Sequence, residues 1–92
     1  MRIGQITLTA AATPLIPAGN PNVYASVLSI QDNAGHDVRV GDNTVTASRG
    51  QAVTANGSIY TAPVPPRGTL LNQWFVFGTN GDVIDFLYED AQ

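Results

Sequence analysis

Apolar and polar residues alternate with a period of two along most of the chain, and no window shows helical spacing. In the first segment, about residues 3–10, Ile6 and Leu8 alternate with Gln5, Thr7 and Thr9, which predicts a strand. Seven further segments are predicted to be strands: about Val23–Gln31, Val38–Val40, Asn43–Ala47, Ala52–Thr54, Ser58–Thr61, Thr69–Gly78 and Val83–Glu89. The pattern therefore predicts an all-β protein.

Turn-forming residues separate these segments and indicate how they connect. Asp32–Asp37 and Thr79–Asp82 are each expected to join a hairpin, and Asn56–Gly57 favours a two-residue hairpin turn with positive φ. The N-terminal strand or arm leads into a proline-rich loop at residues 11–22, and a second proline loop spans Pro63–Gly68. Seven to eight short strands with regular turns predict one domain, residues 1–92, folded as a small antiparallel β-sandwich or β-barrel.

The last two predicted strands are apolar on both faces. Because strand side chains alternate, Trp74 and Val76 face one way while Phe75 and Phe77 face the other. The final strand has Ile84, Phe86 and Tyr88 on one face, and Val83, Asp85 and Leu87 on the other. A sheet with one solvated face alternates apolar with polar residues, so these strands are expected to be covered on both sides.

Two sources of that cover are open. One is another protein, either a second copy or a different partner, because large apolar patches usually mark interfaces. The other is a lid formed by the proline loops at Leu15–Pro17 and Val64–Pro66.

Composition limits the functions that fit. The chain has 92 residues, of which 43% are hydrophobic and 12% charged, and a chain of this size buries only about 60–65% of its unfolded surface. It has no cysteine, so a disulfide framework and a thiolate metal site are excluded. A net charge of −3 with four scattered arginines makes nucleic acid an unexpected partner. No stretch has the length of a membrane helix and the N-terminus lacks a signal-peptide pattern, so we expect synthesis in the cytoplasm and no membrane partner.

Candidate catalytic and metal-binding residues are sparse. His36, the single histidine, lies in a turn beside Asp37, and none of the serines at 26, 29, 48 and 58 is in a nucleophile-elbow pattern. Calcium ligands in the turns (Asp32, Asn33, Asp37, Asp42 and Asn43) are a minority interpretation, because Asp and Asn are ordinary turn residues. We expect no catalytic residue, no cofactor and no metal.

Two stretches carry a resemblance to a known class of proteins. They are Val38–Gly50, with its V-R-V-G-D and R-G motifs, and Phe77–Glu89, with its terminal G-D-V hairpin. Together they resemble small β-rich structural proteins of tailed bacteriophages, and are most similar to capsid decoration, or cement, proteins. The resemblance implies a non-enzymatic virion protein that binds the major capsid protein on the outer surface of the head, assembles as a homotrimer and stabilises the shell.

An interface of this kind directs attention to arginine and large aromatic residues, which dominate interface energetics. We expect Trp74, Phe75 and Phe77 to divide between core and interface, and Arg67 to anchor a polar contact. Asp85 interrupts an apolar strand, so it either discourages edge pairing or pairs with an arginine at an interface, Arg39 or Arg67.

Other function classes give alternatives. A phage tail or spike component has the same sequence texture, and a carbohydrate-binding module would use Trp74, Tyr24 or Tyr60 as a sugar platform. A small hydrolase would use the carboxylates of Asp82 and Asp85. The sequence has few spare aromatic residues and a single histidine, which disfavours both the sugar-binding module and the hydrolase.

Overall fold

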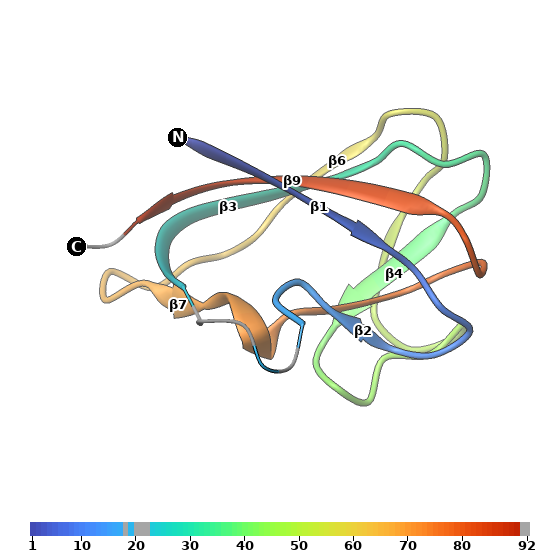
Figure 1. Cartoon of the computed structure of the whole chain (residues 1–92), viewed down its shortest axis with the longest axis horizontal. Coiled ribbons are helices and arrows are strands. Elements are labelled where there is room, and N and C mark those ends of the chain that lie inside the picture. The colour runs from blue at the N-terminus through green and yellow to red at the C-terminus, as the bar shows by residue number, and fades with distance from the viewer. Residues whose placement is uncertain (18, 20–22, 91–92) are drawn as a thin grey trace.

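Two antiparallel sheets pack face to face as a β-sandwich in the computed structural model, which describes residues 1–17, 19 and 23–90 (Figure 1). The predicted all-β fold is confirmed, as a sandwich and not as a closed barrel. Residues 18 and 20–22 of the predicted proline-rich loop lie outside the described residues.

The larger sheet has the strand order β1-β9-β3-β6, and β7 also pairs with β3. Its strands are β1 (Arg2–Thr7), β3 (Tyr24–Asp32), β6 (Ile59–Thr61), β7 (Thr69–Leu70) and β9 (Val83–Asp90). The long strands β3 and β9 lie side by side at its centre, which leaves β1 at one edge.

The smaller sheet has the order β2-β8-β4-β5. Its strands are β2 (Thr13–Pro14), β4 (Val38–Gly41), β5 (Gln51–Val53) and β8 (Phe75–Phe77). A one-turn 3₁₀ helix, η1 (Leu71–Gln73), leads from β7 in the larger sheet to β8 in the smaller one.

The core lies between the sheets and follows the predicted alternation. In β9, Ile84 and Phe86 are buried, while Asp85 and Leu87 on the other face are more exposed. The main core side chains are Ile6, Leu8, Leu28, Ile30 and Leu71 together with Val38, Val40 and Val76. Full burial of each such side chain contributes about 1.5–3 kcal/mol, so this layer stabilises the fold.

None of the three predicted hairpins forms. The turns at Asp32–Asp37, Asn56–Gly57 and Thr79–Asp82 each cross from one sheet to the other, so the strands on either side of them are not paired. The turn chemistry itself is confirmed at Asn56 and Gly57, which have φ of 67° and 100°. Turn residues determine where the chain reverses, whereas packing of the inner faces determines which sheet the next strand joins.

Two predicted strands are also wrong in detail. Residues 43–47 form turns, because the Asp42 carboxylate accepts the Thr44 N–H at 2.8 Å and holds the chain in a local turn. The long strand predicted at residues 69–78 is broken by η1, which buries Leu71.

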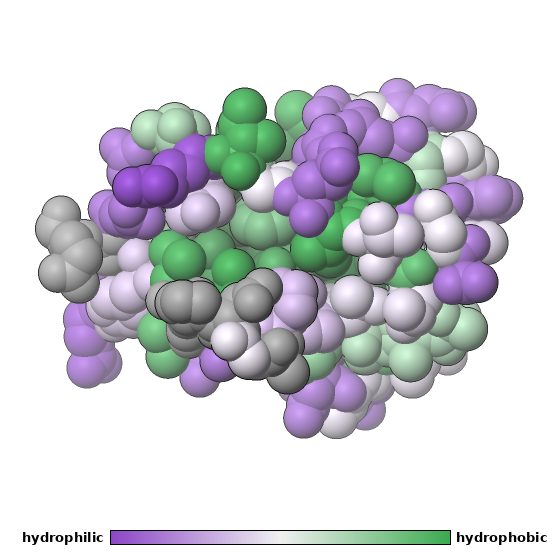
Figure 2. All heavy atoms as spheres, in the orientation of Figure 1, coloured by the Kyte–Doolittle hydropathy of each residue, from purple (hydrophilic) through white to green (hydrophobic). Residues whose placement is uncertain are grey.

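Both proline loops contribute to the core between the sheets, whereas the lid alternative placed them over the second apolar face of the last strands, where Leu87 stays exposed. Leu15 is buried, its N–H donates to the Trp74 carbonyl at 3.0 Å, and Ile16 and Val64 pack against the core cluster. Figure 2 shows one face of the molecule, on which apolar atoms gather in the middle and polar atoms are most frequent toward the upper and right-hand parts. The described residues of both loops therefore add side chains to the core.

Gly4 gives a test of the packing between β1 and β9. It lies opposite Phe86 in the ladder, and a Cβ at Gly4 would overlap the carbons of the Phe86 ring. We predict that Gly4→Ala lowers the free energy of unfolding by about 1–3 kcal/mol, measured by urea denaturation, because overpacking displaces a core ring.

Gly35→Ala is the matched control. A Cβ there meets no atom within 4 Å, so its effect should stay within about 0.5 kcal/mol. Equal unfolding free energies for the two variants would show that the packing of the Phe86 ring does not require the absence of a Cβ at residue 4.

Candidate functional site

Exposed apolar side chains gather on the outer face of the larger sheet. Ile3 is 77% exposed, Ile59 63%, Val27 44% and Leu87 41%, and we call these four residues the outer-face patch. They come from four strands of one sheet: Ile3 from β1, Ile59 from β6, Val27 from β3 and Leu87 from β9. The patch contrasts with the buried inner face of the same strands.

The strand register places these residues in adjacent rows. Ile3 lies opposite Leu87, which in turn lies opposite Ser29 on β3. In the next row, Gln31 on β3 separates Asp85 from Ile59. The row of Ile3 and Leu87 therefore has its apolar residues toward β1, whereas the row of Asp85 and Gln31 has its apolar residue, Ile59, on β6.

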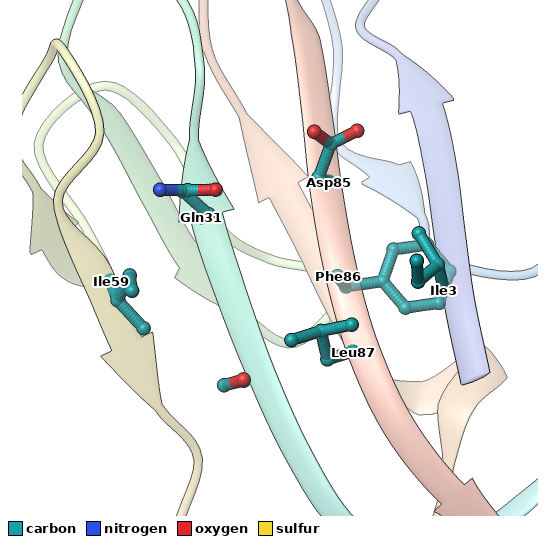
Figure 3. Close-up of a pocket in the computed structure, with 7 residues that line it drawn as sticks. Ile3, Gln31, Ile59, Asp85, Phe86 and Leu87 are labelled. Carbon is teal, nitrogen blue, oxygen red and sulfur yellow. The ribbon is translucent and has the colours of Figure 1, made fainter. Parts of the chain in front are cut away.

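A shallow pocket of about 200 Å³ lies within these rows (Figure 3). Its lining residues are Ile3, Ser29, Gln31, Ile59, Asp85, Phe86 and Leu87. Figure 3 shows Ile59, Leu87 and Ile3 on three different strands, with Gln31 and Asp85 at one end. The surface around the pocket is thus apolar, with polar side chains at one end, and protein–protein interfaces likewise combine an apolar centre with a polar rim.

Asp85 is held by neutral partners on this face. Gln5 Nε2 donates to one carboxylate oxygen at 2.8 Å, and Asn33 Nδ2 donates to the other. Arg39 instead donates from Nη1 to the Gly50 carbonyl at 2.8 Å. Within the chain Asp85 therefore lacks the predicted arginine pair, and pairing across an interface stays a prediction.

The other predicted interface residues do not share this surface. Phe75 and Phe77 are half-buried on the outer side of the smaller sheet, because Val76 between them faces the core. Arg67 is exposed in the proline loop and forms no ion pair with a described residue. The structure thus separates residues that the sequence analysis had grouped.

Trp74 belongs to the margin of the core. Its Nε1 donates to Thr69 Oγ1 at 2.9 Å, and its ring centroid lies 6.4 Å from that of Tyr60. Both rings pack against buried residues, so neither ring is presented whole as a flat platform.

The candidate catalytic side chains lie apart or bond elsewhere. His36 Nδ1 lies 3.0 Å from Asp82 Oδ2, a contact that joins the turn before β4 to the turn before β9. Ser26 Oγ donates to the Glu89 carbonyl, and Ser58 Oγ bonds Thr54. Among the described residues, His36 has no serine as a hydrogen-bond partner.

Turn aspartates serve the backbone. Asp37 Oδ1 accepts the Ala55 N–H at 2.8 Å, and hydrogen bonds from the Thr44 hydroxyl and N–H lower the pKa of Asp42. In the described ranges, no three or more His, Asp or Glu side chains are grouped so that they could hold a metal ion. Asp37 and Asp42, two of the calcium ligands considered from the sequence, thus accept hydrogen bonds from backbone N–H groups.

Asp32 is the buried acidic residue of this end of the sandwich. It has no solvent exposure, its Oδ1 accepts the Ala34 N–H at 2.9 Å, and its Oδ2 has no partner among the described atoms. Burial, reinforced by the charges of Asp82 and Asp37, raises the pKa of Asp32 against the opposing effects of the Ala34 hydrogen bond and His36.

Comparison with known proteins identifies no relative: no protein-family model, curated protein or solved structure matches the chain. Within the part of the chain that the structure describes, no helix is long and apolar enough to cross a membrane.

The sequence analysis missed Ile3 and Ile59 as surface residues. For Ile3 a signal was present, because it shares the outward phase of Gln5 and Thr7 while Ile6 points inward. Ile59 lies on a three-residue strand, too short for its phase to be read from alternation.

Asp32 gives a prediction about pH. Because its pKa is raised in the folded state, the charged form costs stability at neutral pH, and this cost disappears as the pH falls through the raised pKa. Asp32→Asn keeps the oxygen that accepts the Ala34 N–H but does not titrate. We predict that the unfolding free energy of the wild type rises relative to that of Asp32→Asn between pH 7 and pH 4.

The measurement is urea denaturation of both proteins across that pH range. A difference between the two that stays constant with pH, or that moves in the opposite direction, would contradict the assignment.

Proposed function

We propose that this protein is a non-enzymatic structural protein of a virion, which decorates the outside of a bacteriophage head and binds the capsid surface through the outer face of its larger sheet. The observation that carries the proposal is the outer-face patch, with Ile3, Ile59 and Leu87 around one shallow pocket. The resemblance of the sequence to decoration proteins supplies the biological setting.

Burial energetics support a docking role for this face. Full burial of an Ile or Leu side chain contributes about 1.5–3 kcal/mol, and Ile3 and Ile59 keep most of their surface exposed in the isolated chain. A partner that covers them gains most of that free energy, and the gain scales with the apolar area removed from water.

The surroundings of the patch support a protein partner. Ser29 and Thr61 are small and continue the row of Ile3 and Leu87 toward the β6 edge, so that row presents no bulky obstacle. Asp85 is already hydrogen-bonded by Gln5 and Asn33, so its burial leaves those hydrogen bonds intact.

Copy number in purified virions tests this function. A decoration protein occurs at a copy number comparable with that of the major capsid protein, because its sites repeat over the shell. We predict that quantitative mass spectrometry of particles from the source phage will find the chain in that proportion. A few copies per particle would indicate a tail or spike component, and absence from the particle would refute the proposal.

A further inference from the structure

Among the described residues, the larger sheet has one long edge that pairs with no further strand, and that edge is β1. Pairing joins β1 to β9 alone, and β1 is six residues long without proline or lysine. The other edges are short: β2 has two residues and contains Pro14, and β5 and β6 have three residues each. Proteins normally shorten or charge their sheet edges to prevent pairing, so β1 departs from the pattern of its own molecule.

Backbone direction shows what this edge offers. Leu8 follows β1 directly, and its N–H and carbonyl bond to Asp82 and Gly81, on the side of β9. Because N–H and carbonyl groups alternate sides along a strand, those of Ile3, Gln5 and Thr7 point away from β9. None of these three residues has a backbone hydrogen bond to a described residue outside the β1–β9 ladder.

We propose that β1 pairs with β1 of a second copy of this chain, antiparallel about a twofold axis at Gln5, so that two larger sheets become one continuous sheet. In this register Gln5 faces Gln5, and Ile3 faces Thr7 of the other copy. Each of these residues then exchanges both of its outward backbone hydrogen bonds with the opposite strand.

Charge and shape favour a second copy as the occupant. No residue from Ile3 to Thr7 is charged, so the register sets no like charges opposite each other. The charges at the start of the strand are already neutralised, by Arg2 with Asp90 at 3.0 Å and by the N-terminal amine with Glu89 at 2.7 Å.

The inner side of the new pair is also free of obstruction. Gly4 of one copy lies opposite Ile6 of the other, so no Cβ is brought against the core at that point. Beside Thr7, a shallow pocket of about 210 Å³ separates the strand from Thr13, Pro14 and Pro17 of the following segment. This pocket leaves space for side chains of the opposite strand beside Thr7.

Such a pair differs from the trimer that the resemblance implies, since a twofold strand pair closes after two copies. It is also independent of capsid binding: a chain that stays monomeric can still occupy the head, and a dimer can form from a chain that virions lack. A strand pair alone is smaller than the about 1,200–2,000 Å² of a standard interface, so we expect the dimer to dissociate on dilution.

Light scattering of the purified protein over a concentration series, with two variants, tests the edge itself. Gln5→Pro removes an outward N–H while leaving the N–H groups that face β9, and Gln5→Ala keeps that N–H. We expect the wild type and Gln5→Ala to approach twice the monomer mass at high concentration, and Gln5→Pro to remain monomeric with an unchanged circular dichroism spectrum. A wild-type monomer at the highest soluble concentration, or a dimer that survives Gln5→Pro, would overturn the proposal.

Disulfide trapping tests the register without relying on proline. The chain has no cysteine, and two residues in a hydrogen-bonded antiparallel pair have Cα atoms about 5.5 Å apart, within disulfide range. Under mild oxidation Gln5→Cys should form a covalent dimer at least tenfold faster than Ile59→Cys, a control at an exposed site on the opposite edge. Equal rates for the two variants would contradict the twofold axis at Gln5.

Discussion

The structure depends on the inner faces of β3 and β9, which lie next to each other at the centre of the larger sheet. Leu28, Ile30, Ile84 and Phe86 turn inward from these two strands and are covered by the smaller sheet. The described residues form two layers and no third, so the side chains that β3 and β9 carry on their other face lie at the surface. The exposure of Leu87 follows directly from the burial of Phe86.

This constraint explains what could be predicted from the sequence. Strand phase is local, and the alternation of Ile84 and Phe86 with Asp85 and Leu87 identified the two faces of β9 correctly. Turn chemistry is also local, as positive φ at Asn56 and Gly57 shows. The pairing of strands is not local: β8 and β9 follow each other in the chain but pack in different sheets, an outcome decided by contacts across the core.

The candidate site was predicted less completely for the same reason. The sequence placed Asp85 on one face of its strand with Leu87, and the structure shows that this is the outer face. Phe75 and Phe77 belong to the other sheet, so they cannot share a surface with it. Trp74 was grouped with the interface by residue type, whereas its bond to Thr69 holds it at the core margin. Residue type identifies side chains that interfaces favour, and only the strand order shows which of them are neighbours.

The central claim is that the outer face of the larger sheet binds the capsid. Co-sedimentation with heads assembled without this protein tests it most directly, using Ile59→Lys on that face and Gln51→Lys, an exposed position on β5 of the other sheet. The account predicts that Ile59→Lys loses binding to the heads while Gln51→Lys binds like the wild type. Binding that survives Ile59→Lys, or that is lost with Gln51→Lys, would contradict it.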